Sequence, residues 1–252
     1  ETKLAGFHWT KVESRDSTKR YNKFNLSDLN TVTDAFNWTA YLAAQGVAAQ
    51  KDLIVNQPSF VKGFGETLTA TPLTDWQTYL TFHTLSNFAG SLTKALDDEN
   101  FDFFSKQLSG REEQRPMWKR GVAVVNGNLG EVIGKVYVGR HFKPEAKTRM
   151  TQLVENLRGA YGASIDELEW MSEATKKAAH VKLASFDPKI GYPDKWEDYS
   201  ALMIKSDDLV GNKIRSGTVA HEKEVAKLGG PIDRQEWGMT PQTVNAYYNP
   251  TK

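Results

Sequence analysis

Hydrophobic residues recur along this chain mostly three and four positions apart, the spacing that places side chains on one face of an α-helix. In the first half the pattern predicts helices over residues 25–33, 37–44, 58–68, 74–96 and 101–108. Gly46 stands where a left-handed residue would end the second of these helices, and Thr74 with Gln77 predicts a capping box at the start of the fourth. The first half is therefore predicted to be helical.

The second half continues the same helical period over longer stretches. It predicts helices over residues 117–142, 144–168 and 172–184, with Ser172 as the cap of the last. Gly127, Gly130 and Gly134 leave a stripe without side chains on the first of these helices, which would let another helix approach closely. Their order is not that of a dinucleotide-binding loop and no strand precedes them, so we interpret them as packing residues.

Extended structure is predicted at two places only, near residues 53–55 and near the C-terminal end. Pro241 disfavours a helical conformation of Thr240, the branched and aromatic residues over 244–248 favour a strand, and Asn249-Pro250 predicts a turn. A free strand edge pairs with an extended peptide through its backbone, although it can equally be an ordinary sheet edge. The predicted fold is mainly α, a multi-helical region with a short extended segment at the C-terminal end.

Composition narrows the function without naming it. The 252 residues are 39% hydrophobic and 25% charged, which is typical of a globular chain with a substantial core. A net charge of +1 without a basic block gives no indication of a nucleic-acid partner, and no stretch has the length of a membrane span. The absence of cysteine excludes disulfides, thiolate zinc sites and a cysteine nucleophile.

No catalytic or metal-binding residue can be assigned from the pattern of histidines. A zinc peptidase helix needs two histidines one turn apart with a glutamate between them. His221-Glu222 begins such a motif, but Val225 stands at the second ligand position, so we interpret this stretch as a solvated helix face. The remaining histidines lie one per predicted element, and no serine, histidine and acid group is recognisable.

Several motifs in order resemble the neprilysin-like zinc metallopeptidases, which include neprilysin, endothelin-converting enzymes and bacterial oligopeptidase O. The C-terminal motif is Trp-x-Met-Thr-Pro-x-x-Val-Asn-Ala-Tyr-Tyr over residues 237–248. Further matching motifs occupy residues 116–120, 125–130, 136–138, 170–171, 175–177 and 190–196. Met117 replaces the usual arginine, and Gly121 replaces a cysteine of the animal enzymes, which excludes the corresponding disulfide.

The resemblance implies a function that this chain does not complete alone. Residues 1–200 would form the helical, cavity-forming lid, and residues 201–252 the hinge and the start of the catalytic domain. Asn245 and Ala246 match the edge strand that binds substrate. The zinc ligands of the family come later, so the expected partners are peptide substrates and a C-terminal catalytic region. Zinc is expected in a longer parent protein and not in this inactive fragment, and an extracytoplasmic location is implied.

Two other functional classes compete with this interpretation. A free-standing helical interaction module could use the open edge over residues 244–248 without any catalytic partner. A self-contained hydrolase is disfavoured because no recognisable site is present. A His-Glu-x-x-His helix in the reading frame after Lys252 would distinguish the zinc peptidase from both.

Overall fold

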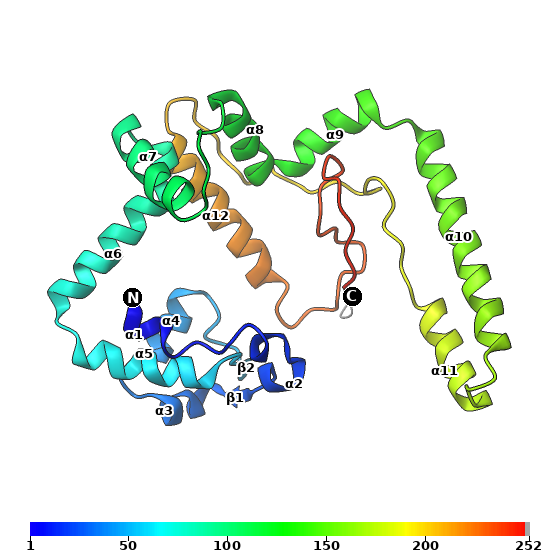
Figure 1. Ribbon diagram of the computed structural model, residues 1–252, viewed down its shortest axis with the longest axis horizontal. Helices are drawn as coiled ribbons and strands as arrows, with labels where there is room; N and C mark the ends of the chain where they lie inside the picture. Colours follow the sequence, from blue (N-terminus) through cyan, green and yellow to red (C-terminus); the bar gives the residue numbers. More distant parts are fainter. Residues whose placement is uncertain (250–252) are drawn as a thin grey trace. The chain divides into compact units, whose positions relative to one another are not determined.

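The computed structural model describes residues 1–249 and is mainly helical, as the hydrophobic spacing predicts (Figure 1). The chain divides into two compact units, Glu1–Glu112 and a second that begins at Glu113. The predicted division after residue 200 separates two functional roles, the lid and the hinge, and it is not tested by this division into compact units. It stays a prediction.

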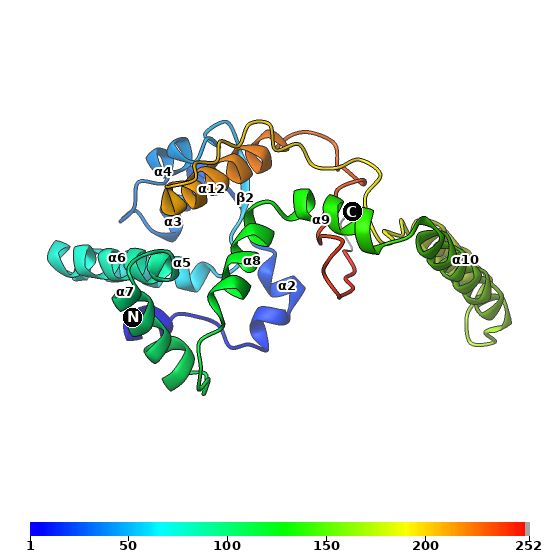
Figure 2. The same ribbon diagram turned by 90° about the horizontal axis from the view of Figure 1, so that it is seen from above.

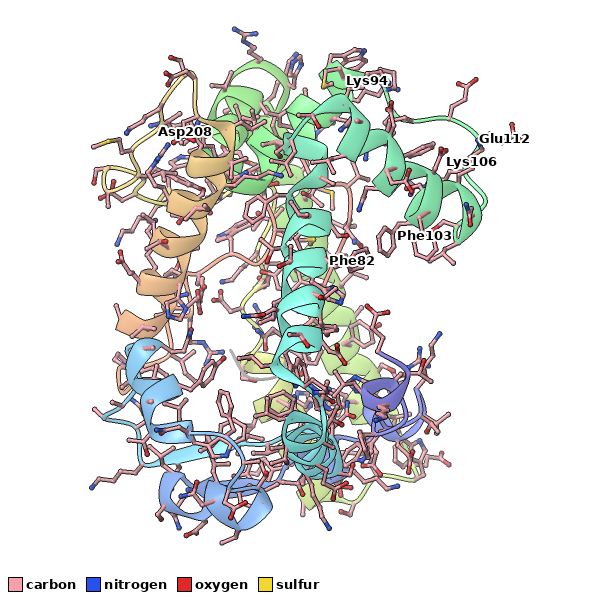
Figure 3. All side chains as sticks on the ribbon, turned by 90° about the vertical axis from the view of Figure 1, so that its left-hand side faces the viewer. Phe82, Lys94, Phe103, Lys106, Glu112 and Asp208 are labelled. Atoms are coloured by element: carbon pink, nitrogen blue, oxygen red, sulfur yellow. The ribbon has the colours of Figure 1, made fainter. Side chains whose placement is uncertain are left out.

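The first unit joins short helices to three longer helical stretches. Its α-helices are α1 (Thr2–Ala5), α2 (Ser17–Arg20), α3 (Leu29–Val32), α4 (Trp38–Ala44), α5 (Pro58–Ala70), α6 (Leu73–Phe88) and α7 (Lys94–Asn100). Single 3-10 turns cover Glu13–Arg15, Leu26–Asp28 and Ala89–Ser91, and a π-helix covers Phe101–Gln107. The side chains of Phe82 on α6 and Phe103 on the π-helix are nearly half exposed (Figure 3).

A small antiparallel sheet closes the start of this unit. Strand β1 (Lys23–Asn25) pairs with β2 (Asp52–Ile54), with Phe24 opposite Leu53. Strand β2 confirms the extended run predicted near residues 53–55. Strand β1 lies at the start of a stretch predicted as a helix over 25–33, and that prediction is wrong at its beginning because the Leu26 N–H donates to Lys51 O across the sheet (2.8 Å).

Close backbone packing defines the interior of the first unit. Gly63 and Gly65 of α5 are buried, and a Cβ on each would meet the ring of Phe7 and the side chain of Thr33. Leu29 is only 2% exposed. The glycines therefore let neighbouring segments approach the helix at the distance of its backbone.

Helix α6 differs from the sequence prediction at its start and at its end. Its first residue follows Pro72, no side chain caps it, and Thr74 lies inside the helix, where its carbonyl accepts a hydrogen bond from Thr78 Oγ1 (3.0 Å). The predicted capping box is therefore wrong. The helix also ends at Phe88 and not near residue 96, because the chain tightens into the 3-10 turn Ala89–Ser91.

The second unit consists of longer helices joined by irregular stretches. Its helices are α8 (Met117–Asn128), α9 (Gly130–His141), α10 (Pro144–Glu167), α11 (Glu173–Ala184) and α12 (Leu209–Ala226). Helices α10 and α11 pack against each other as an antiparallel pair (Figure 1), and Figure 2 shows α8, α9 and α10 from above. Ser172 Oγ accepts from Thr175 N (3.2 Å), which confirms the predicted cap of α11.

Candidate functional site

The stretch just before the predicted substrate segment, residues 243–248, packs against the junction between helices α8 and α9. The sequence predicts one helix over 117–142, but Leu129 leaves the helical conformation with φ −134° and ψ 38°, so that prediction is wrong. Asn128 contributes to the break, because its side chain donates to Val124 O (2.7 Å) and its carbonyl accepts from Ser216 Oγ of α12 (3.5 Å). Two helices with different axes replace one.

A charged cluster fixes the first turn of α9. Glu131 Oε2 accepts from the backbone N–H of Glu197 (2.6 Å), and Lys223 of α12 donates to Glu197 Oε1 and to the carbonyl of Asp198 (both 2.6 Å). The Lys223 ammonium lies 5.0 Å from the ring centroid of Tyr199. Burial, with Glu197 nearby, raises the pKa of Tyr199 to about 12. The cluster therefore joins α9 and α12 to the irregular stretch between α11 and α12 that carries Glu197 and Tyr199.

A second polar cluster closes the loop before α12. Asp208 caps the helix by accepting from Gly211 N (2.8 Å), and it pairs with Arg215 (2.9 Å) (Figure 3). Arg215 Nε also donates to Met203 O (2.9 Å). The Arg215 guanidinium and the Gly211 N–H hold the pKa of Asp208 below its usual value. These contacts are structural, because they connect the loop before α12 with the first two turns of that helix.

The loop over residues 190–196 packs against α10. Lys147 of α10 donates to Tyr192 O (2.9 Å) and to Asp194 Oδ1 (2.8 Å), and its ammonium lies 4.3 Å from the Tyr192 ring centroid. A cavity of about 210 Å³ lies beside this loop, with Glu155 and Trp237 in its lining. Trp237 is the first residue of the C-terminal motif, so the cavity adjoins the start of that motif.

Within the described residues, the predicted substrate segment is neither helical nor paired as a strand. Residues 243–249 form no helix, and no β-strand is assigned to them. Asn245 and Ala246 are exposed neighbours, and Val244 is fully exposed at 102%. Asn245 Oδ1 accepts from Ala246 N (2.8 Å). Pro250, the second residue of the predicted turn, lies outside the described residues.

The histidine candidate lies on a solvent-facing part of α12. His221 is exposed, and Val225 follows one helical turn later. Over residues 1–249, no group of three or more histidine, aspartate or glutamate side chains is arranged to hold a metal ion. The donor set of these described residues does not fit a zinc site. Over the same residues, no helix is long and apolar enough to cross a membrane.

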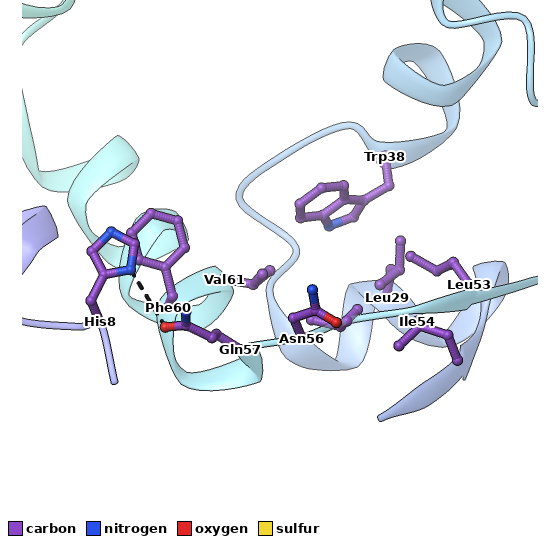
Figure 4. Close-up of a pocket in the computed structure, with 10 residues that line it drawn as sticks. His8, Leu29, Trp38, Leu53, Ile54, Asn56, Gln57, Phe60 and Val61 are labelled. Atoms are coloured by element: carbon purple, nitrogen blue, oxygen red, sulfur yellow. Dashed lines mark hydrogen bonds between the residues drawn. The ribbon is translucent and has the colours of Figure 1, made fainter. Parts of the chain in front are cut away.

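A separate apolar pocket of about 340 Å³ lies in the first unit (Figure 4). Trp38, Leu53 and Phe60 contribute to its walls, and His8 stacks on Phe60 with ring centroids 4.2 Å apart. Gln57 Oε1 faces His8 Nδ1 at 3.4 Å. Its lining is aliphatic and aromatic with amides at the side, and it contains no acid and nucleophile pair.

The contacts of Gln242 were not anticipated from the sequence. Its side chain reaches α8 and the first residue of α9, and no local motif announces this role. The sequence predicts a close approach at the neighbouring glycines, but by another helix. In the structure Thr240 and Pro241 lie against Gly130 and Gly134, whereas no other part of the described chain, apart from the backbone of its own helix and its chain neighbours, lies within 4 Å of a Cβ added to Gly127. A glycine stripe indicates close approach but does not identify the approaching segment.

Comparison with known proteins identifies relatives over the whole chain. A family model described as peptidase family M13 matches residues 1–193. An endothelin-converting enzyme homolog of Locusta migratoria is 28% identical over an alignment that covers 100% of this chain and 37% of the relative. Neprilysin-2 of Drosophila melanogaster is 27% identical over 99% of this chain and 35% of its own length. The chain thus spans little more than a third of these curated relatives.

Solved structures agree with this result. The zinc metalloprotease Zmp1 of Mycobacterium tuberculosis, in complex with an inhibitor, is 44% identical with a TM-score of 0.90, over 99% of this chain and 38% of that one. PepO of Lactobacillus rhamnosis is 23% identical with a TM-score of 0.84, over 99% of this chain and 40% of that one. The second likeness concerns the fold alone.

Proposed function

This chain belongs to peptidase family M13, and we propose that it is the helical, non-catalytic part of a zinc metalloendopeptidase that cleaves oligopeptides. The match of the family model over residues 1–193 carries this proposal. In it, the helices shape a substrate cavity, and the segment over residues 243–248 provides an edge for the peptide backbone. Zinc and its ligands belong to a catalytic region that the described residues do not contain.

The polar groups available on the segment support the assignment of Asn245 and Ala246. Asn245 Oδ1 is already bonded to Ala246 N, which leaves Asn245 Nδ2 as a donor. The backbone N–H groups of Val244 and Asn245 have no hydrogen bond to another described residue. Unpaired backbone donors beside an exposed amide are suited to an extended peptide, whose carbonyls need donors.

The exposed apolar side chains of α10 support the proposal that a further region packs here. Met150, Leu153, Leu157 and Tyr161 lie on one helix face, and they are exposed by 44%, 49%, 50% and 63%. At about 25 cal/mol per Å² of apolar surface, leaving such a stripe in water forgoes several kcal/mol. We assign the catalytic region of the complete protein as its partner, because the relatives are more than twice as long as this chain.

The proposal is tested on the complete product of the reading frame that contains this chain. Asn245→Ala should lower kcat/KM roughly 3- to 100-fold, because a lost neutral hydrogen bond costs roughly 0.5–1.5 kcal/mol and a stranded partner roughly 1–3 kcal/mol. Zinc content and Tm should not change. Asn30→Ala is the matched control, since Asn30 is an exposed asparagine of α3 without a side-chain hydrogen bond.

A second variant separates a substrate contact from a structural role. Asn245→Asp keeps the acceptor for Ala246 N but removes the Nδ2 donor. A substrate contact through Nδ2 predicts that both variants lose turnover, whereas a purely structural role predicts that only Asn245→Ala loses stability. Normal turnover of Asn245→Ala at normal zinc occupancy would remove Asn245 from the site. A product without zinc or peptidase activity would instead favour the interaction module.

A further inference from the structure

The side chain of Gln242 holds the start of the substrate segment against two helices. Its Nε2 donates to Gly130 O (3.0 Å), at the first residue of α9, and lies 3.3 Å from Asn126 Oδ1 of α8. Its Oε1 is buried and has no hydrogen-bond partner among residues 1–249. The amide therefore reaches into the α8–α9 junction and uses its donor group there, close to the residues proposed to bind substrate.

The surface that receives this segment is shaped by two glycines. A Cβ on Gly130 would lie 2.6 Å from Thr240 Cγ2. A Cβ on Gly134 would lie 2.8 Å from Pro241 Cδ and 3.0 Å from Gln242 Oε1. Both glycines are buried. Real Cβ atoms do not approach other atoms this closely, so a larger residue at Gly130 would move the Thr240 side chain, and one at Gly134 would push the Pro241 ring away from α9.

The far end of the segment is held by its two tyrosines. Tyr247 accepts a hydrogen bond at its hydroxyl from Gly238 N (3.0 Å), which closes the chain over residues 238–247 into a loop. The ring of Tyr248 lies 5.8 Å from that of Phe186. Residues 243–246 thus run between two fixed points while their own side chains remain exposed.

We propose that Gln242 is a positioning residue for the peptide substrate, acting through Val244, Asn245 and Ala246. The proposal rests on the proposed function, because it assumes that these three residues contact the peptide. Gln242 and the glycines of α9 order the segment before substrate arrives, so the peptide does not have to order it on binding. Loosening the segment should therefore weaken substrate binding and leave the bond-cleaving step unchanged.

The anchor is first tested by hydrogen–deuterium exchange of residues 238–249 in this chain. Gln242→Met keeps the length of the side chain and removes its donor, while Gly134→Ala adds one methyl group against Pro241. We expect exchange of the hydrogen-bonded amides of Gly238 and Thr243 to accelerate roughly 5- to 100-fold, the range that one or two lost hydrogen bonds produce. Gly139→Ala is the matched control on α9, because nothing among the described residues, apart from its own helix backbone and chain neighbours, lies within 4 Å of the added Cβ.

The positioning role is then tested by kinetics on the complete product of the reading frame. Gln242→Met should raise KM roughly 3- to 30-fold with kcat changed less than about twofold, the signature of lost uniform binding. Gly134→Ala should do the same, and Gly139→Ala should change neither constant.

Three other outcomes would overturn the anchor, the positioning role or the substrate contact. Exchange in Gln242→Met and Gly134→Ala as slow as in Gly139→Ala would overturn the anchor itself. Faster exchange with unchanged KM, together with a loss of activity in Asn245→Ala, would overturn the positioning role and leave the proposed function intact. Unchanged kinetics in Asn245→Ala as well would show that the proposed substrate contact is wrong, and the positioning role would fall with it.

Discussion

Gly63→Ala should destabilise the first unit, although alanine favours helices more than glycine does. The added Cβ would lie 2.2 Å from Cγ of Phe7 and 2.3 Å from its Cδ1, so the ring must move away from α5. Overpacking of this kind costs about 1–3 kcal/mol, while the gain in helix propensity is at most about 1 kcal/mol. The net loss should be about 1–2 kcal/mol, which lowers Tm by roughly 3–10 °C.

A double-mutant cycle tests whether Phe7 is the cause of that loss. Urea unfolding is measured for Gly63→Ala, Phe7→Leu and the double variant, because removing the aromatic ring should relieve the overlap. Gly121→Ala serves as a control for alanine at an exposed helix position and should be neutral or stabilising. Over residues 1–249, only its own helix backbone and chain neighbours lie within 4 Å of the added Cβ. An equal cost of Gly63→Ala in both Phe7 backgrounds, or a stabilisation, would refute the reasoning.

Two further predictions concern protonation and metal binding. The raised pKa of Tyr199 means that the folded chain keeps this proton between pH 10 and about 12 while the unfolded chain loses it, so stability falls as pH rises through that window. Between pH 10 and about 12 the free energy of unfolding, measured with urea, should therefore fall by about 1 kcal/mol less for Tyr199→Phe than for the unchanged chain, after a discount for solvent screening; an equal fall in both would contradict this. The chain by itself should neither retain stoichiometric zinc after dialysis nor cleave peptides, and chelator-sensitive cleavage by the purified chain would contradict that expectation.

The sequence predicts helices α10 and α11 well because their signals are local. The helical period over 144–168 and the cap at Ser172 need no information from distant residues, and α10 and α11 match both. Gly46 likewise adopts the left-handed conformation expected at the end of α4, with φ 74°. The prediction fails for short elements whose conformation depends on a residue far away in the sequence. Strand β1 forms because Phe24 pairs with Leu53, and no local sequence pattern predicts that pairing.

Local sequence signals also fail to predict how the candidate site is assembled. The glycines of α9 announce a close approach, but only the tertiary structure identifies residues 240–242 as the approaching segment. The break at Leu129 explains why Gly127 takes no part, because it separates Gly127 from the helix that carries the other two. A period-based prediction assumes one helix axis, and the Asn128 side chain and Ser216 act against that assumption.

The charges of the second unit explain how its irregular stretches are held without a sheet. Several cations donate to backbone carbonyls as well as to carboxylates: Lys147 to Tyr192, Lys189 to Arg234, Arg215 to Met203, and Lys223 to Asp198. Each bond satisfies a carbonyl that a regular ladder would otherwise satisfy. The four cations also pair with carboxylates, which accords with a net charge of only +1. These bonds therefore hold the stretch between α11 and α12 against α10 and α12, and Lys189 joins that stretch to Arg234 after α12.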